Sequence, residues 1–170
     1  MAFETERLLI RPTTIEDAPF IMELMNTPQW ITNIGNRNIR NVDDAKNYIL
    51  DKMIPQYEKL GYSNNTVIRK SDNVKIGTCG LYKRDGLDSV DLGFAFLPEF
   101  QKKGYAYESN LQLVKTAFTF HHLKKLKAIT IKENIASQNL LLKLGFKPIG
   151  FFEIPNEEEK LLLFELDGGL

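Results

Sequence analysis

The chain has 170 residues, of which 43% are hydrophobic, which is enough for one well-filled core but short for two. Lysine and arginine balance aspartate and glutamate, so the formal net charge is zero, and both signs are spread along the whole chain. This balance argues against nucleic acid and against a membrane surface as partners, because both select a basic face. We therefore expect one domain over residues 1–170, with any anion site confined to a short segment.

Cysteine usage and the N-terminal segment favour a cytoplasmic protein. The single cysteine, Cys79, has no partner for an intrachain disulfide and is expected to be a small core residue. The N-terminal segment carries acidic residues where a signal peptide would carry an apolar run, and no run approaches the length of about 18 apolar residues that crosses a bilayer. His121 and His122 have no cysteine or carboxylate cluster beside them, so no metal site is expected.

The N-terminal third is expected to hold one strand and two helices. The stretch RLLIRPT reads as a strand that Pro12 ends, and Thr14 is a suitable cap for the helix that follows it. Residues 27–40 are rich in asparagine and contain proline and glycine, so they are expected to form a loop or a broken helix. The next helix begins after the cap Asn41, and Pro55 is expected to kink or end it.

From residue 65 onward, the spacing of apolar residues changes to that of strands. Three short β-rich runs, separated by SDN and DGLD turns, predict an antiparallel meander. A helix over residues 105–121, the strand LKAITIKE, a helix ending at Gly145 and a hairpin around PNEEE complete the chain. The predicted fold class is α/β (α+β), with a mixed, mostly antiparallel sheet of about seven strands flanked by about four helices.

The segment FLPEFQKKGYAYES, residues 96–109, joins an apolar strand to an amphipathic helix. It lacks the glycine spacing of both common nucleotide-binding loops, but it contains Gln101, Gly104 and Ala106 in the order Q-x-x-G-x-A. Backbone N–H groups at a helix N-terminus attract an anion, and glycine and alanine let the anion approach closely. The alternative is a solvated turn that happens to be basic.

The Q-x-x-G-x-A pattern resembles the pyrophosphate-binding motif of the GNAT superfamily of acetyl-CoA-dependent N-acetyltransferases. A second block, AITI followed by ENIASQNLLLKLGFKPIG, resembles the Asn-x-x-Ser helix of this superfamily, and the predicted order of elements agrees along nearly the whole chain. The segments ERLLIRPTTIEDA and PEFQKKGYAYES are similar to the RimJ/RimL-like branch. The resemblance implies an N-acetyltransferase fold and activity, with acetyl-CoA as cosubstrate and no metal.

By this resemblance, the loop binds the pyrophosphate of coenzyme A. The strand before the loop would carry a bulge and diverge from its neighbour, which leaves backbone groups free for pantetheine and for the oxyanion of the reaction. Asn134 would contact pantetheine and also cap its own helix. The implied cofactor-binding residues are Phe96, Leu97, Gln101, Lys102, Lys103, Gly104, Tyr105, Ala106 and Asn134.

The resemblance also suggests catalytic residues. Asp91, where some members carry a glutamate, is the candidate general base, and the alternative is a carboxylate that faces solvent. Many members use a tyrosine as the acid, but its position here is Leu141, which has no proton to give. Ser137 is then the candidate that protonates or hydrogen-bonds the leaving thiolate. Its alternative is an ordinary place in the first turn of a helix capped by Asn134.

The amine acceptor is less defined than the acetyl donor. Trp30, Asn33 and Arg37 fall where the superfamily builds its acceptor-binding wall, although the segment could also be a connecting loop. The acceptor is expected to be a primary amine, either a protein N-terminal α-amine or a small molecule, and the chain a monomer or homodimer. An α-amine needs only a weak base, because its reference pKa is near 7.7 to 8.0. The competing function is a non-catalytic module that binds acyl-CoA.

Overall fold

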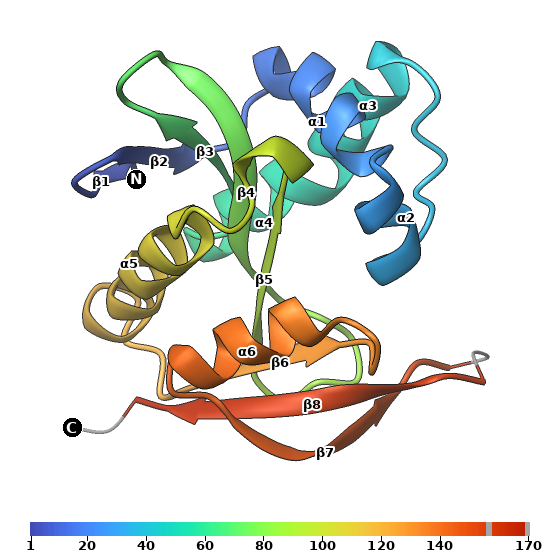
Figure 1. Cartoon of the computed structure of the whole chain (residues 1–170), viewed down its shortest axis with the longest axis vertical. Coiled ribbons are helices and arrows are strands. Elements are labelled where there is room, and N and C mark those ends of the chain that lie inside the picture. Colours follow the sequence, from blue (N-terminus) through green and yellow to red (C-terminus); the bar gives the residue numbers. More distant parts are fainter. Residues whose placement is uncertain (156–157, 169–170) are drawn as a thin grey trace.

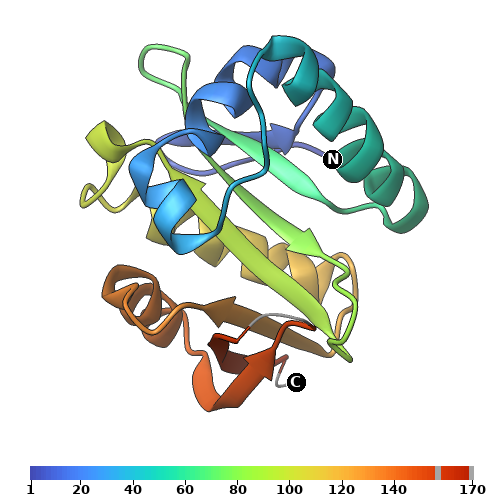
Figure 2. The ribbon, with the colours of Figure 1, turned by 90° about the vertical axis from the view of Figure 1, so that its right-hand side faces the viewer.

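The computed structural model describes residues 1–155 and 158–168. In these ranges the chain forms one eight-stranded sheet in the order β1-β2-β3-β4-β5-β6-β8-β7, with helices on both faces (Figures 1 and 2). Among the described strand pairs only β5–β6 is parallel, so the predicted class, a mixed and mostly antiparallel sheet with flanking helices, is confirmed. The strands are β1 (Phe3–Glu4), β2 (Leu8–Pro12), β3 (Asn64–Arg69), β4 (Val74–Tyr82), β5 (Val90–Phe96), β6 (Lys125–Thr130), β7 (Lys147–Glu153) and β8 (Lys160–Asp167).

The helices gather in two groups along the chain. Four lie between β2 and β3, and α5 and α6 follow β5 and β6 within the described residues. The first group continues from a 3₁₀ turn at Ile15–Asp17, and a second 3₁₀ turn at Pro98–Phe100 precedes α5. None of these helices is long and apolar enough to cross a membrane. The helices are α1 (Ala18–Met25), α2 (Pro28–Asn33), α3 (Val42–Tyr48), α4 (Ile54–Leu60), α5 (Tyr105–Thr119) and α6 (Ile135–Lys143).

The N-terminal third holds more regular structure than the sequence predicted. The short strand β1 was not predicted, and α2 is a helical turn inside the segment expected to be a loop or broken helix. Thr27 caps α2 by accepting the N–H of Trp30 at 3.3 Å, and Pro28 occupies its first position, where a missing N–H costs nothing. A cap and a well-placed proline therefore outweighed the glycine and asparagine that follow.

Pro55 does not end its helix, but the helix is irregular just before it. Asn41 caps α3 as predicted, accepting the N–H of Asp44 at 2.8 Å, and helical structure then continues to Leu60. A π-helical turn at Ile49–Met53 ends two residues before Pro55. Proline lacks the N–H that would bond four residues back, and a widened turn ahead of it accommodates that loss.

The two faces of the sheet bury separate cores. On one face, α5 and α6 cover a cluster that includes Leu81, Leu113 and Phe164. On the other face, α1, α3 and the π-helical turn pack together, and Leu97, directly after β5, joins this second cluster. The end of β5 is therefore held from both sides, which gives the adjoining loop a rigid base.

The sheet opens between β5 and β6. These strands pair only at Val90↔Leu126 and Asp91↔Lys127, although β5 continues to Phe96 and β6 to Thr130 (Figure 2). The predicted divergence is confirmed, but the predicted bulge is wrong, because β5 keeps an unbroken register with β4 over its length. The opening thus arises on the β6 side of a regular strand. The closing β7–β8 hairpin forms as predicted, and residues 156–157 at its tip lie outside the described residues.

Candidate active site

Backbone groups of β5 face the opening. The N–H of Leu97 donates to the carbonyl of Ile76 at 3.0 Å, next to the β4–β5 ladder. Because alternate residues of an antiparallel strand turn their backbone groups to opposite sides, Phe94 and Phe96 present theirs to the opening. The Phe96 carbonyl accepts from Gln101 Nε2 at 2.9 Å, so the Phe96 N–H and both groups of Phe94 face a potential ligand. The Leu97 N–H is therefore already used within the chain, and the free backbone groups near the end of β5 are those of Phe94 and the N–H of Phe96.

The loop between β5 and α5 adopts an unusual backbone. Lys102 has φ 58° and Gly104 has φ 84°, both in the left-handed region. Glycine accepts this conformation readily, whereas lysine does so only at a cost. Gln101, through its bond to Phe96, ties the loop to the end of the strand rather than reaching outward. Gln101 thus shapes the loop through its side-chain bond, and Lys102 and Gly104 shape it through their backbone conformations. The exposed side chains of the lysines do not contribute to that shape.

A row of backbone donors begins α5. The first backbone bond of the helix runs from Glu108 N–H to Gly104 O at 3.0 Å. The N–H groups of residues 102–107 donate to no acceptor in the part of the chain that the structure describes. Tyr105 and Ala106 pack into or against the first core, which fixes this helix end. Free donors at the positive end of a 15-residue helix make an anion-binding arrangement.

Asp91 is a buried carboxylate, and the solvent-facing alternative is wrong. It is 2% exposed, its Oδ2 accepts from Arg84 Nε at 2.9 Å, and its Oδ1 is buried without a partner among the described residues. Burial raises the pKa of Asp91 to about 6, against the opposing effect of Arg84. Ala95 lies on the same face of β5 and packs against the second core, so Asp91 faces the side of the sheet covered by α1 and α3. Sequence reasoning missed Arg84, which lies in an irregular loop.

Ser137 lies at the other end of the opening. Asn134 accepts the Ser137 N–H at 3.1 Å, so the predicted cap of α6 is confirmed, and the Ser137 hydroxyl has no partner in the described chain. Asp91 pairs with Lys127, whereas α6 begins only after β6 has ended at Thr130. Three residues of strand span about 10 Å. The structure therefore does not bring the two predicted catalytic residues together.

The position of the expected tyrosine acid is filled by a core residue. Leu141 is 1% exposed and belongs to the first core. It offers no proton, so Asp91 and Ser137 remain the predicted residues with a group that can exchange one.

The predicted acceptor-binding residues lie on and after α2, beyond the opening from α6 (Figure 2). Trp30 packs half-buried against the second core, and its Nε1 is buried without a partner among the described residues. Asn33 is half-buried at the last position of α2, and Arg37 is exposed in the segment that follows. The Trp30 ring is thus fixed by its packing, whereas the Arg37 side chain is exposed to solvent.

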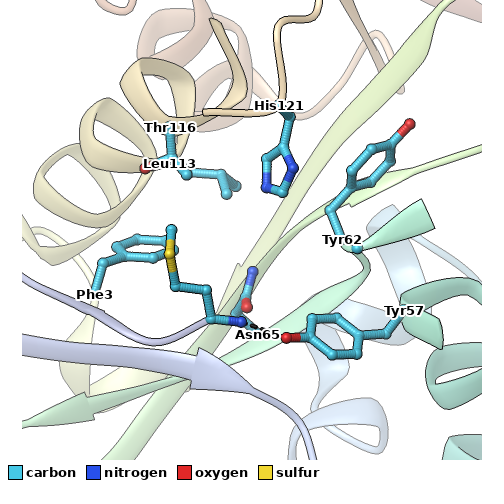
Figure 3. A pocket seen from close by; sticks show the side chains of 9 residues that line it. Phe3, Tyr57, Tyr62, Asn65, Leu113, Thr116 and His121 are labelled. Carbon is cyan, nitrogen blue, oxygen red and sulfur yellow. Dashed lines mark hydrogen bonds between the residues drawn. The ribbon is translucent and has the colours of Figure 1, made fainter. Parts of the chain in front are cut away.

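Features given no catalytic role lie elsewhere. Figure 3 shows a small pocket of about 10 Å³ between β3 and α5, where His121 contacts Tyr62 edge to face at 5.1 Å between ring centroids. Burial is the main factor that lowers the pKa of His121. Cys79 is buried as predicted, and burial raises the pKa of its thiol to about 12, so it is no thiolate nucleophile. No group of side chains suited to a metal ion occurs in the described ranges.

Comparisons with known proteins agree with this geometry. The chain is 29% identical to YnaD, an uncharacterized N-acetyltransferase of Bacillus subtilis, over 94% of this chain and 91% of that protein. Its fold matches a GNAT-family acetyltransferase of Bacillus anthracis with a TM-score of 0.81, 25% identity and coverage of 99% of both chains. It also matches RimL, a ribosomal L7/L12 α-N-protein acetyltransferase solved with coenzyme A, with a TM-score of 0.84 and 12% identity over 98% of each chain.

A family model extends this likeness to the sequence itself. The model described as an acetyltransferase (GNAT) domain matches residues 7–147, a range that includes strands β2 to β6, the loop and α6. The chain therefore belongs to the GNAT acetyltransferases, which take their acetyl group from acetyl-CoA.

Proposed function

We propose that the chain transfers the acetyl group of acetyl-CoA to a primary amine by direct attack in a ternary complex. The amine is either the α-amine of a protein N-terminus or a small-molecule amine. The observation that carries the proposal is the row of free N–H donors at residues 102–107, placed at the end of a strand whose backbone lines an opening in the sheet. One side of the opening then receives the donor and the other the amine.

In this proposal the pyrophosphate of coenzyme A is held by the N–H groups of residues 102–107. Pantetheine runs along the free edge of β5, pairing with Phe94 and passing Asn134 at the start of α6. The Phe96 N–H donates to the thioester oxygen and stabilises the oxyanion that forms there. These roles are supported by free backbone groups in both places and by the rigid packing of Leu97 and Tyr105 on either side of the loop.

The chemical step needs a neutral amine. Its nitrogen attacks the thioester carbon and forms a C–N bond, and the C–S bond then breaks to release the thiolate of coenzyme A. The proton lost by the nitrogen goes to the Asp91 carboxylate, and a water molecule relays it across the distance from the reacting carbon. With a pKa of about 6, Asp91 is ionised at neutral pH and is a weak base. Such a base suits an amine that is already partly neutral, as an α-amine is.

Two further groups complete the proposed site. The Ser137 hydroxyl donates a hydrogen bond to the leaving sulfur, and a thiol pKa of about 8.5 makes the demand for a stronger acid small. Trp30, Asn33 and Arg37 form the acceptor wall, with the Trp30 ring fixed by its packing against the second core. Support for this wall comes from Trp30, which packs against the second core and whose Nε1 is buried without a partner among the described residues.

The test follows thiol release from acetyl-CoA with a panel of N-terminal peptides, polyamines and aminoglycosides, alongside a calorimetric titration with coenzyme A. The proposal expects binding of coenzyme A and turnover with at least one amine class. Tight binding without turnover on any amine supports the non-catalytic module instead. A chain that binds no coenzyme A rules out both functions.

A further inference from the structure

The end of the first hairpin lies against the start of α5. Glu108 Oε1 accepts from Thr5 Oγ1 at 2.6 Å and from Arg7 N at 2.9 Å, and its Oε2 accepts from Arg7 Nε at 2.6 Å. Arg7 Nη1 also donates to the carbonyl of Lys103 at 3.0 Å. The Arg7 guanidinium lies over the ring of Tyr105, 4.4 Å from its centroid. One arginine side chain therefore contacts three positions around the proposed pyrophosphate loop.

The bond to Lys103 sets the direction of a donor. In a trans peptide unit the C=O and the following N–H point in opposite directions. Because Arg7 holds the Lys103 carbonyl on its own side, the Gly104 N–H of the same peptide unit is turned to the other side. A Cβ on Gly104 would stand 3.2 Å from Arg7 Nη2, which shows how closely the arginine covers the loop. The left-handed conformation of Lys102 needs such support, since a residue other than glycine seldom holds it.

The bonds to Glu108 remove an electrostatic conflict. A carboxylate in the first turn of α5 is favoured by the helix dipole, but it lies within one turn of donors proposed to bind an anion. Its bonds to Thr5 and Arg7, with Arg7 supplying the opposite charge, lower the pKa of Glu108 against the effect of burial. The carboxylate is thus ionised, fully bonded and compensated. Without Arg7 it would compete with the pyrophosphate for the same helix end.

We propose that Arg7 is a positioning residue for the pyrophosphate site. It orients the loop through the Lys103 carbonyl and neutralises Glu108, without touching the reacting atoms. This inference rests on the proposed binding of coenzyme A at residues 102–107, and it makes the N-terminal segment part of the site.

The test compares Arg7→Gln and Arg7→Lys with the matched control Lys70→Gln. The Lys70 side chain donates to Thr5 O at 2.9 Å and to Glu4 at 3.1 Å, and it makes no hydrogen bond to the loop among the described residues. Calorimetry gives the Kd of coenzyme A for each variant. NMR titration gives the Kd of pantetheine, which lacks the pyrophosphate. Circular dichroism and a melting curve report whether each variant folds.

Arg7→Gln is expected to weaken coenzyme A about 10-fold to 100-fold, as for a lost hydrogen bond to a charged group, and to leave pantetheine unchanged. Lys70→Gln should match the wild type for both ligands. Arg7→Lys should restore only a small part of the loss, because a lysine supplies the charge without the guanidinium fork.

Three results would overturn the inference: unchanged coenzyme A binding in Arg7→Gln, an equal loss for both ligands, or full rescue by Arg7→Lys. The last would mean that charge alone matters and that the loop is not oriented. If Arg7→Gln does not fold, Arg7→Lys decides the matter by the same ligand comparison. A wild-type chain that binds no coenzyme A contradicts the proposed function itself, which separates the two failures.

Discussion

Asp91 is a carboxylate whose environment sets its usefulness. Desolvation raises the pKa of Asp91, and the bond to Arg84 only partly offsets this. The other carboxylate oxygen, Oδ1, has no partner among the described residues. In a solvent-exposed position the same residue would be ionised over a wider pH range and would be a weaker base. A buried acid with an open oxygen is typical of a site that exchanges protons.

The rate should therefore show an acid limb. Below about pH 6 Asp91 is protonated and cannot accept the proton of the amine, so kcat/KM should fall with an apparent pKa near 6. Asp91→Asn should lower kcat about 100-fold at pH 7.5 and abolish this limb. The limb of the amine substrate itself is identified by repeating the profile with an amine of different pKa. A wild-type rate in Asp91→Asn would remove Asp91 as the base.

Arg84 should tune this limb. The guanidinium lowers the pKa of Asp91, so Arg84→Gln should raise it further and move the acid limb to higher pH. At pH 7 the variant would then have less ionised Asp91 and a lower rate, while its rate at pH 8.5 would approach that of the wild type. Lys83→Gln, which removes an equal charge one residue away from an exposed position, is the matched control. A limb that does not move would show that the profile reports another group.

Gly104 should be sensitive to substitution for two reasons that can be separated. Its φ of 84° strains any other residue, and a side chain at this position would meet the Arg7 side chain, which covers the loop. Gly104→Asp also places a negative charge among the donors, so it should weaken coenzyme A more than 100-fold, measured by calorimetry. Gly150→Asp, at another positive φ with open space around it, should share the strain but keep the affinity. Equal losses in both variants would indicate a general folding effect.

At the scale of elements, a buried network joins the 3₁₀ turn before α1 to the sheet. Asp17, fully buried, accepts from Arg11 at 2.7 and 2.9 Å, from Lys75 at 2.7 Å and from Thr66 at 3.1 Å. These partners come from β2, β4 and β3, and they hold the pKa of Asp17 well below its usual range. The network fixes the helices of the acceptor side against strands that also carry the site.

Asp17→Asn should lower the free energy of unfolding by about 3 kcal/mol at pH 7, because it leaves two cations without their buried partner. Since the pKa is lower in the folded state, this stability is present above the unfolded value of about 3.9 and is lost as the pH falls toward the folded value. Urea unfolding at pH 7 and near pH 3 should show the difference between variant and wild type shrinking in acid. A difference that is equal at both values would contradict the assignment.

Elements with strong local signals could be predicted from the sequence, and those that depend on distant contacts could not. Asn41, Asn134 and the Q-x-x-G-x-A loop carry their own chemistry, and the structure finds them capping or shaping the predicted places. The partnership of Arg7 with Glu108 joins positions 101 residues apart, so no local pattern indicates it. The strand β1 has only two residues and exists because β2 is there to pair with it.

At the scale of the whole molecule, the proposed site lies where the sheet divides. Strands β1 to β5 stand on one side of the opening and β6, β8 and β7 on the other, as Figure 1 shows. The donor loop follows the last strand of the first part, and Asn134 and Ser137 follow the first strand of the second. Each part therefore contributes half of the proposed site, and a ligand in the opening would touch both.

Coenzyme A should stabilise the fold and protect particular amides. A ligand that binds only the folded chain adds about 2.7 kcal/mol at 100 times its Kd, which a melting curve can measure. Hydrogen exchange should slow at the Phe94 and Phe96 amides, which face the opening. It should change little at the Leu97 amide, which already donates to Ile76. Equal protection of all three amides would mean that pantetheine does not pair with β5.

Because the β5–β6 contact is short, bound coenzyme A would also have a structural role. In the described chain, the strands of the two halves of the sheet pair directly at two residue pairs. Pantetheine laid along the free edge of β5 would act as an additional strand between them, supplied from solution rather than encoded in the chain. Because the first core already packs residues of both halves together, such as Leu81 and Phe164, bound coenzyme A would add a second, concentration-dependent connection to a fold that is already continuous.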